Sequence, residues 1–114
     1  MSELCHIALV AVHPERNVRR TYRLALGRDL FGDWTVELRY GRMGQRGQER
    51  RITCDSLEEA RRVARAYLRR RASAPRRIGC PYRIVSIDPG QTDLLSPVLP
   101  SGFLPKKGWV GGLS

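Results

Sequence analysis

Residues 21–40 read TYRLALGRDLFGDWTVELRY, and this stretch decides the fold. Every second side chain from Tyr22 to residue 26 is apolar, and the pattern repeats from Trp34 to Tyr40. Alternation with a period of two is typical of a β-strand with one face on a core. Glycines near both ends of residues 27–33 indicate a short connection. The stretch therefore predicts a hairpin with Trp34, Val36, Leu38 and Tyr40 inward and Thr35, Glu37 and Arg39 outward.

The flanking segments extend this hairpin into a sheet. Residues 4–12 are rich in Ile, Leu and Val and contain no turn residue, so they predict a strand that Pro14 ends. Residues 48–53 follow the glycine loop 41–47 as a return strand, and residues 82–87 resemble a last strand. Short turns between these runs indicate an antiparallel β-sheet meander.

A helix is predicted to begin after Ser56. Ser56 and Glu59 have the spacing of a capping box, and basic residues 69–71 suit the negative end of the helix dipole. Pro75 is expected to end the helix. Apolar residues recur at helical spacing at Leu57, Ala60, Val63, Ala64, Tyr67 and Leu68. The expected fold class is α+β, an antiparallel meander with one amphipathic helix packed on one face.

The positive charge lies in the first 87 residues. The 114-residue chain has 21 Lys and Arg against 11 Asp and Glu, a formal net charge of +10, whereas residues 88–114 are neutral overall. Such a surplus favours polyanionic partners such as nucleic acid. The excess of Arg over Lys fits phosphate binding and also fits a GC-rich genome.

This division suggests a folded domain, residues 1–87, and an extended Pro/Gly-rich apolar tail, residues 88–114. The tail is too rich in Pro and Gly for regular structure, yet it holds large apolar residues. We expect the stretch from Leu94 to Leu104 to pack in extended form on the sheet or on a second copy. If it does not, it is a docking segment for a protein partner.

Several classes of function are not expected. Cys5, Cys54 and Cys80 have no zinc or CxxC spacing, so the sequence predicts no metal, no cofactor and free thiols in a cytoplasmic protein. The longest apolar run, residues 7–12, is far shorter than the ~20 residues of a membrane helix. The N-terminus lacks the basic region of a secretory signal. No motif of a nucleophile, P-loop or zinc protease is present, so we expect no enzyme and no small-molecule substrate.

The stretch from Arg16 to Gln48 resembles the WGR domain family. The residues that carry the likeness are Asn17, Arg20–Leu24, Leu30–Trp34, Tyr40–Gly44 and Gly47–Gln48, and the likeness extends over residues 4–83. WGR domains occur in DNA-dependent poly(ADP-ribose) polymerases, where they bind DNA ends, and as small bacterial proteins. The resemblance implies a non-enzymatic nucleic-acid-binding module of the bacterial type. It would bind DNA rather than RNA, at the backbone or ends, with little sequence specificity. The alternative is a protein–protein adaptor that uses the basic face and the tail.

The resemblance also suggests contact residues. The family's Trp and Arg fall on Tyr40 and Arg42, and its late Tyr falls on Tyr82, although Tyr replaces Trp and two residues separate Gly79 from Tyr82. Tyr40 fits a core position equally well. The helical arginines Arg61, Arg62, Arg65 and Arg69 are expected to form a solvated face. The candidate nucleic-acid-binding residues are Tyr40, Arg42, Arg46, Gln48, Arg39, Asn17 and Tyr82.

Overall fold

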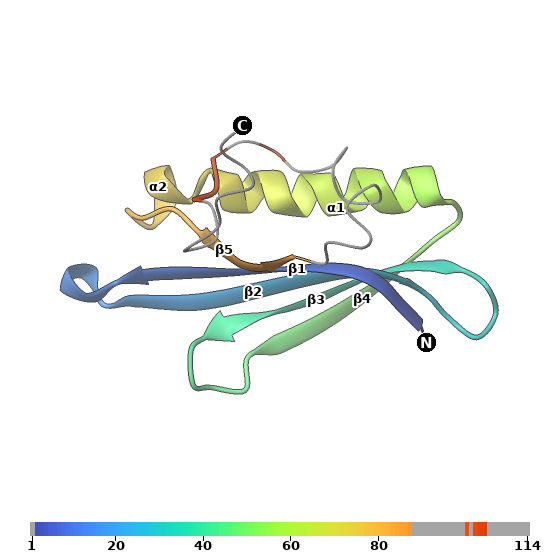
Figure 1. The fold of residues 1–114 in the computed structure, drawn as a ribbon, viewed down its shortest axis with the longest axis horizontal. Coiled ribbons are helices and arrows are strands. Elements are labelled where there is room, and N and C mark those ends of the chain that lie inside the picture. The colour runs from blue at the N-terminus through green and yellow to red at the C-terminus, as the bar shows by residue number, and fades with distance from the viewer. Residues whose placement is uncertain (1, 88–99, 101, 105–114) are drawn as a thin grey trace.

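A five-stranded sheet with one long helix on one face makes up the fold (Figure 1). The computed structural model describes residues 2–87, 100 and 102–104. The strands are β1 (Ser2–His13), β2 (Val18–Arg28), β3 (Trp34–Arg42), β4 (Gln48–Cys54) and β5 (Arg83–Ile87). The helices are α1 (Leu57–Ala72), the short α2 (Ala74–Arg77) and one 3-10 turn, η1 (Pro14–Arg16). The α+β class expected from the sequence is confirmed.

The strand order is β4-β3-β2-β1-β5, so the meander holds for the first four strands only. After β4 the chain crosses the sheet as α1 and returns on the far side, where β5 pairs antiparallel with β1. Alternation along single strands cannot predict that β5 pairs with β1, because this pairing depends on where α1 ends. The β2–β3 register, with Tyr22 opposite Tyr40, agrees with the predicted hairpin.

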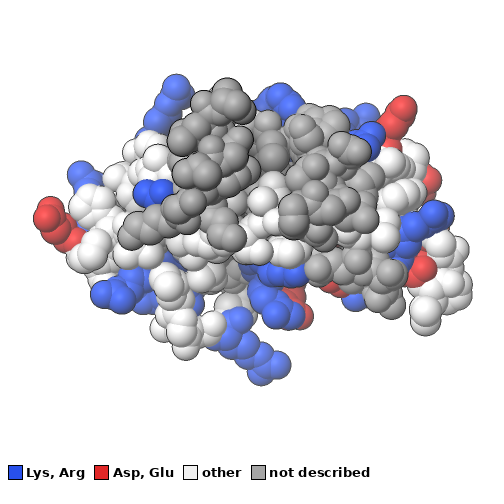
Figure 2. Space-filling view, in the orientation of Figure 1, with Lys and Arg blue, Asp and Glu red and all other residues white. Residues whose placement is uncertain are grey.

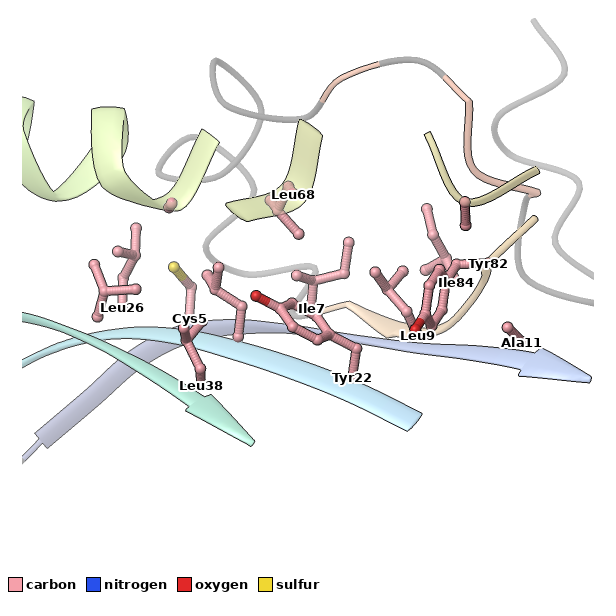
Figure 3. Packing of buried hydrophobic residues seen from close by; sticks show 14 of the residues in the cluster. Cys5, Ile7, Leu9, Ala11, Tyr22, Leu26, Leu38, Leu68, Tyr82 and Ile84 are labelled. Carbon is pink, nitrogen blue, oxygen red and sulfur yellow. The ribbon is translucent and has the colours of Figure 1, made fainter. Parts of the chain in front are cut away.

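The core lies between α1 and the facing side of β1, β2 and β3. Figure 3 shows Leu68 from the helix and Tyr22, Ile7 and Leu9 from the strands in this layer. All four side chains are almost completely buried. Thr35 lies on the opposite face, as its parity predicts, but it is fully buried there rather than exposed.

The N-terminal end of α1 agrees with the capping prediction, whereas its C-terminal end differs from the predicted one. Ser56 Oγ accepts a hydrogen bond from the Glu59 backbone N–H at 3.1 Å, and Glu59 Oε2 accepts one from the Asp55 N–H at 3.0 Å. Pro75, expected to end the helix, instead lies in the first turn of α2, where a missing N–H costs nothing. The break falls at Ser73, and the chain turns there toward the sheet.

The tail is described only at residue 100 and residues 102–104. Phe103 packs against the core, and Leu104 pairs with Arg83 in a parallel bridge. At Leu104 the tail lies against the sheet, as expected. The rest of the predicted stretch, from Leu94 to Leu99, lies outside the described residues.

Candidate nucleic-acid interface

An open pocket lies where the C-terminal end of α1, α2 and the adjoining ends of β2 and β3 meet. Its volume is about 480 Å³. In Figure 1 the C-terminal end of α1, α2, the start of β2 and the end of β3 all lie toward the end of the molecule where α2 is labelled. Five of the lining residues are arginines and none is acidic, so we call it the arginine pocket. Its lining consists of Arg20, Thr21, Tyr40, Gly41, Arg42, Arg70, Arg71, Ala74, Arg77, Ile78 and Tyr82.

The strand residues reach the pocket through alternation and register. Arg20 pairs with Arg42 and Tyr22 pairs with Tyr40 across β2 and β3. Because side chains two residues apart share a face, all four project toward the helix side. The helix residues Arg70 and Arg71 reach the same place because the last turn of α1 ends above these strand ends.

An aromatic cluster forms the floor and holds one arginine in place. The Tyr22 and Tyr40 rings stack with centroids 5.9 Å apart, and Tyr82 meets Tyr22 edge-on at 6.5 Å. The Arg71 guanidinium lies 4.2 Å from the Tyr22 centroid and 5.9 Å from that of Tyr40. Such a cation–π contact contributes ~0.5–2 kcal/mol and fixes the plane of the guanidinium. Arg71 is therefore oriented before any ligand arrives.

Burial governs the chemistry of the floor. Burial raises the pKa of Tyr22 far above its usual value of 10.0, which keeps the phenol neutral in the folded protein. The Tyr22 hydroxyl has no hydrogen-bond partner among the described residues. The floor therefore contributes aromatic surface and no negative charge.

Arg42 is held by the turn between β1 and β2. Its guanidinium donates to Asn17 Oδ1 at 2.8 Å and to the Asn17 carbonyl at 3.2 Å. Asn17 follows η1 in the left-handed conformation, with φ 54°, which Asn adopts more readily than most residues. Both acceptors are neutral, so the charge of Arg42 is positioned without being cancelled.

The glycine loop after β3 depends on the absence of side chains at its neck. A Cβ on Gly47 would lie 2.5 Å from the Tyr40 carbonyl oxygen, and one on Gly41 would lie 2.7 Å from the Gly47 Cα. Only glycine permits so close an approach of the two strands. The neck also brings Gln48 beside Tyr40, whose hydroxyl donates to Gln48 Oε1 at 3.2 Å.

None of the five pocket arginines forms an ion pair with a carboxylate among the described residues. Arg77 donates to Ser73 Oγ at 3.2 Å and to the Arg70 carbonyl, which is one of the last carbonyls of α1. Both acceptors are neutral oxygens, so these contacts orient the Arg77 guanidinium without cancelling its charge. Figure 2 shows Lys and Arg side chains along much of the outline of the molecule, with acidic side chains at several places between them.

The structure places the candidate residues from the sequence in four different positions relative to the pocket. Tyr40, Arg42 and Tyr82 line the arginine pocket, and Asn17 and Gln48 contact two of them. Arg46 is exposed in the β3–β4 turn and does not line the pocket.

Arg39, the remaining candidate, lies on the opposite face of the sheet. Its guanidinium forms an ion pair with Glu49 there at 2.5 Å. The alternation along β3 that brings Tyr40 and Arg42 together necessarily turns Arg39 away.

Four pocket arginines were missed by sequence reasoning: Arg20, Arg70, Arg71 and Arg77. Arg20 is two residues from Tyr22, so the alternation along β2 could have predicted that both side chains lie on the same face. The basic residues at the end of α1 were assigned to the helix dipole, and their second role depends on the helix–sheet packing. Pro75 predicted that the helix ends near Ser73, but not that a second short helix would follow and bring Arg77 to the pocket.

Other kinds of site are absent from the part of the chain that the structure describes. No three His, Cys, Asp or Glu side chains lie close enough there to hold a metal ion. In the same residues no helix is long and apolar enough to cross a membrane.

Comparison with known proteins adds one finding. The family model described as WGR domain matches residues 5–74, which include most of β1 and all of β2, β3, β4 and α1. No curated protein matches the chain significantly. WGR domains are generally nucleic-acid-binding modules in proteins related to poly(ADP-ribose) polymerases. The match ends at Ala74, so Arg77 and Tyr82 of the pocket lie beyond it.

Proposed function

We propose that this chain, which belongs to the WGR domain family, is a non-enzymatic module that binds DNA at its backbone or ends through the arginine pocket. The observation that carries the proposal is the convergence of five arginines and two tyrosines on one pocket without an acidic residue. Guanidinium groups bind phosphate oxygens through paired hydrogen bonds. A phosphate is therefore the ligand that this lining fits best.

Preorganisation supports the same conclusion. Arg71 is stacked on Tyr22, and Arg42 is hydrogen-bonded to Asn17. A side chain that is already ordered loses less conformational entropy when a ligand binds. Grouping like charges is unfavourable without a counter-charge, and a bound polyanion would remove that repulsion.

Little sequence specificity is expected. Side chains that read bases are usually Asn, Gln, Arg or Lys aimed at groove edges, whereas phosphate contacts carry no base information. The exposed side of α1 carries Arg62, Arg69 and Arg70, with the acidic residues Glu58 and Glu59 at its far end. This surface suits a phosphate backbone and holds no mixed set of base-reading side chains.

The same proposal includes the organisation of the chain. Residues 1–87 would act as the binding domain, and residues 88–114 would be its tail. Three free, buried cysteines are in keeping with a reducing cytoplasmic setting.

A titration tests the proposed ligand class. The protein is titrated with blunt duplex DNA, nicked duplex, single-stranded DNA and RNA of equal length at two salt concentrations. If about five phosphates are neutralised, log K should fall against log salt with a slope of roughly −4 to −5. We expect duplex or nicked DNA to bind more tightly than RNA. Absence of binding at low salt, or a flat salt response, would contradict the proposal.

One observation favours a second candidate function, a protein–protein adaptor. Leu30 and Phe31 are each 89% exposed at the tip of the β2–β3 loop. Asp29 Oδ1 accepts hydrogen bonds from the Phe31 and Asp33 N–H groups, both at 2.9 Å, so the loop holds these side chains in water. Sedimentation velocity over a range of concentrations tests the simplest partner, a second copy. Self-association that Leu30→Ser/Phe31→Ser removes would support this role, and a monomer throughout would exclude that partner.

A further inference from the structure

A second pocket, mainly apolar, lies at the β5 edge of the sheet, and the proposed function does not use it. Its volume is about 520 Å³, and we call it the edge pocket. Val12 is 46% exposed, and Val85 and Leu104 are each 38% exposed. The walls of the edge pocket therefore include apolar surface that is accessible to solvent. The lining residues are Val10, Val12, His13, Cys80, Pro81, Arg83, Val85 and Leu104.

The chain itself leads into this pocket. The Leu104 N–H donates to the Tyr82 carbonyl and the Leu104 carbonyl accepts from the Ile84 N–H, both at 2.9 Å. These two bonds pair Leu104 with the outer edge of β5, parallel to that strand. Leu104 is thus both a wall of the pocket and the last described residue of the chain.

The sequence beyond Leu104 suits that position. An extended chain would turn the nitrogen of Pro105 away from β5, so its missing N–H would break no pairing. Trp109 follows five residues after Leu104, within reach of any wall because five extended residues span ~16–18 Å. Gly108 immediately precedes it and permits a turn.

We propose that the edge pocket is the docking site of this chain's own C-terminal segment, residues 105–114, with Trp109 filling it. Two facts favour this occupant over a free partner. The segment leaves from the pocket wall, and a short tether gives it an effective concentration of about millimolar. The lining is also mainly apolar, with Arg83 and His13 as its charged or polar members, so it fits a large apolar side chain better than a phosphate. Burial of a large aromatic side chain would then cover the exposed valines.

Intrinsic fluorescence tests the proposal in the full-length chain. Trp34 and Trp109 are the only tryptophans, so Trp34→Phe leaves Trp109 as the sole reporter. Phe keeps an aromatic ring beneath Arg28, which lies 5.0 Å from the Trp34 centroid. We expect Trp109 emission at shorter wavelength than that of free N-acetyltryptophanamide, and weaker quenching by acrylamide. Should Trp34→Phe fail to fold, the difference between wild type and Trp109→Phe supplies the same spectrum.

Variants of the pocket rim complete the test. Val12→Glu and Val85→Glu place a charge on the rim, and each should shift Trp109 emission to the wavelength of free indole and increase quenching. Leu30→Glu is the matched control, because Leu30 is 89% exposed in the β2–β3 loop, at the opposite end of β2 from Arg19, the residue that pairs with Val12. Emission of Trp109 like that of the free compound, or no response to either rim variant, would overturn the proposal. If the protection of Trp109 from acrylamide quenching increased with protein concentration, the proposal would also be overturned, because the occupant would then be the tail of a second copy.

Discussion

The two faces of the sheet both carry arginines, but the arginines form ion pairs with carboxylates on one face and have no carboxylate partner in the pocket on the other. On the face away from α1, Arg39 pairs with Glu49 at 2.5 Å and Arg51 pairs with Glu37 at 2.7 Å. We call these four residues the charge ladder. In the arginine pocket, five arginines have no carboxylate partner among the described residues. A net charge of +10 therefore does not predict where positive charge is available, because local partners decide that.

The difference arises from strand parity and helix direction. Glu37 and Glu49 share the outward parity of the ladder arginines, so every acid of β3 and β4 lies on that face. The acidic residues of α1, Glu58 and Glu59, lie in its first turn, far from the last turn that reaches the pocket. The acidic side chains of β3, β4 and α1 are thus kept out of the arginine pocket by their positions in these elements.

The largest expected effect comes from removing three pocket charges together. At about 0.1 M salt each phosphate contact contributes ~8-fold to affinity, because the slope per contact is ~0.9. Arg20→Gln/Arg42→Gln/Arg70→Gln should therefore weaken binding to a blunt DNA duplex by roughly 500-fold. Fluorescence anisotropy with a labelled duplex measures this loss. A loss no larger than that of a single variant would show that the pocket is not the site.

A single pocket arginine should matter more than a single helical arginine. We expect Arg42→Ala to weaken binding by ~8-fold and to reduce the salt slope by about one unit. Arg62→Ala removes the same charge from the exposed side of α1 and should have a clearly smaller effect. Both variants should keep their free energy of unfolding within ~0.5 kcal/mol of wild type. Equal losses of affinity would mean that the charge acts diffusely.

The support of Arg42 by Asn17 should be measurable by itself. Asn17→Gly keeps the left-handed conformation but removes the Oδ1 acceptor. Loss of one hydrogen bond of ~0.5–1.5 kcal/mol should weaken DNA binding a few-fold, through a less ordered Arg42. In the Arg42→Ala background the same change should have no further effect. Additive losses in this double-mutant cycle would contradict the link between the two residues.

A change in the pocket floor should alter the free energy of unfolding rather than the affinity for DNA. Tyr22→Phe removes a buried hydroxyl without a partner and keeps the ring, so we expect the free energy of unfolding to rise by about 1 kcal/mol. Burial raises the pKa of Tyr22, so above pH 10.0 the unfolded phenol ionises while the folded one stays protonated. Wild-type stability should therefore fall as pH rises above that value, and the variant should lack this contribution. Chemical denaturation from neutral to alkaline pH measures both effects.

The smallest effect should come from the charge ladder. Arg51 is exposed, and its pair with Glu37 is a surface ion pair of the kind that contributes ~0–1 kcal/mol. We expect Arg51→Gln to change DNA affinity by less than about 2-fold, because its charge is already neutralised. A loss comparable to that of Arg42→Ala would remove the distinction between the two faces.

The sequence predicts the parts of this arrangement that depend on near neighbours. Alternation from Tyr22 to Leu26 and from Trp34 to Tyr40 predicts which side chains share the core face, and the Ser56–Glu59 spacing predicts the start of α1. These signals lie within one strand or one turn. They also place Tyr40 and Arg42 on the same side of β3.

The remaining features depend on contacts between distant segments. Arg71 meets Tyr22 only because α1 crosses the sheet at a particular angle, and Arg77 turns toward the pocket only because the chain breaks at Ser73. The pairing of β5 with β1 requires the same crossing. Neither periodicity nor capping carries information about that angle, so the helical half of the pocket could not be predicted.

The most direct test compares two charge-matched double variants. Arg20→Gln/Arg42→Gln changes the arginine pocket and Arg39→Gln/Arg51→Gln changes the charge ladder, and each removes two positive charges from the formal +10. Duplex DNA binding is measured against salt for both and for wild type. The pocket double should reduce the magnitude of the log K–log salt slope by ~2 units, whereas the ladder double should change it by less than ~0.5. Equal reductions would contradict the claim that the unpaired arginines of the pocket form the DNA site.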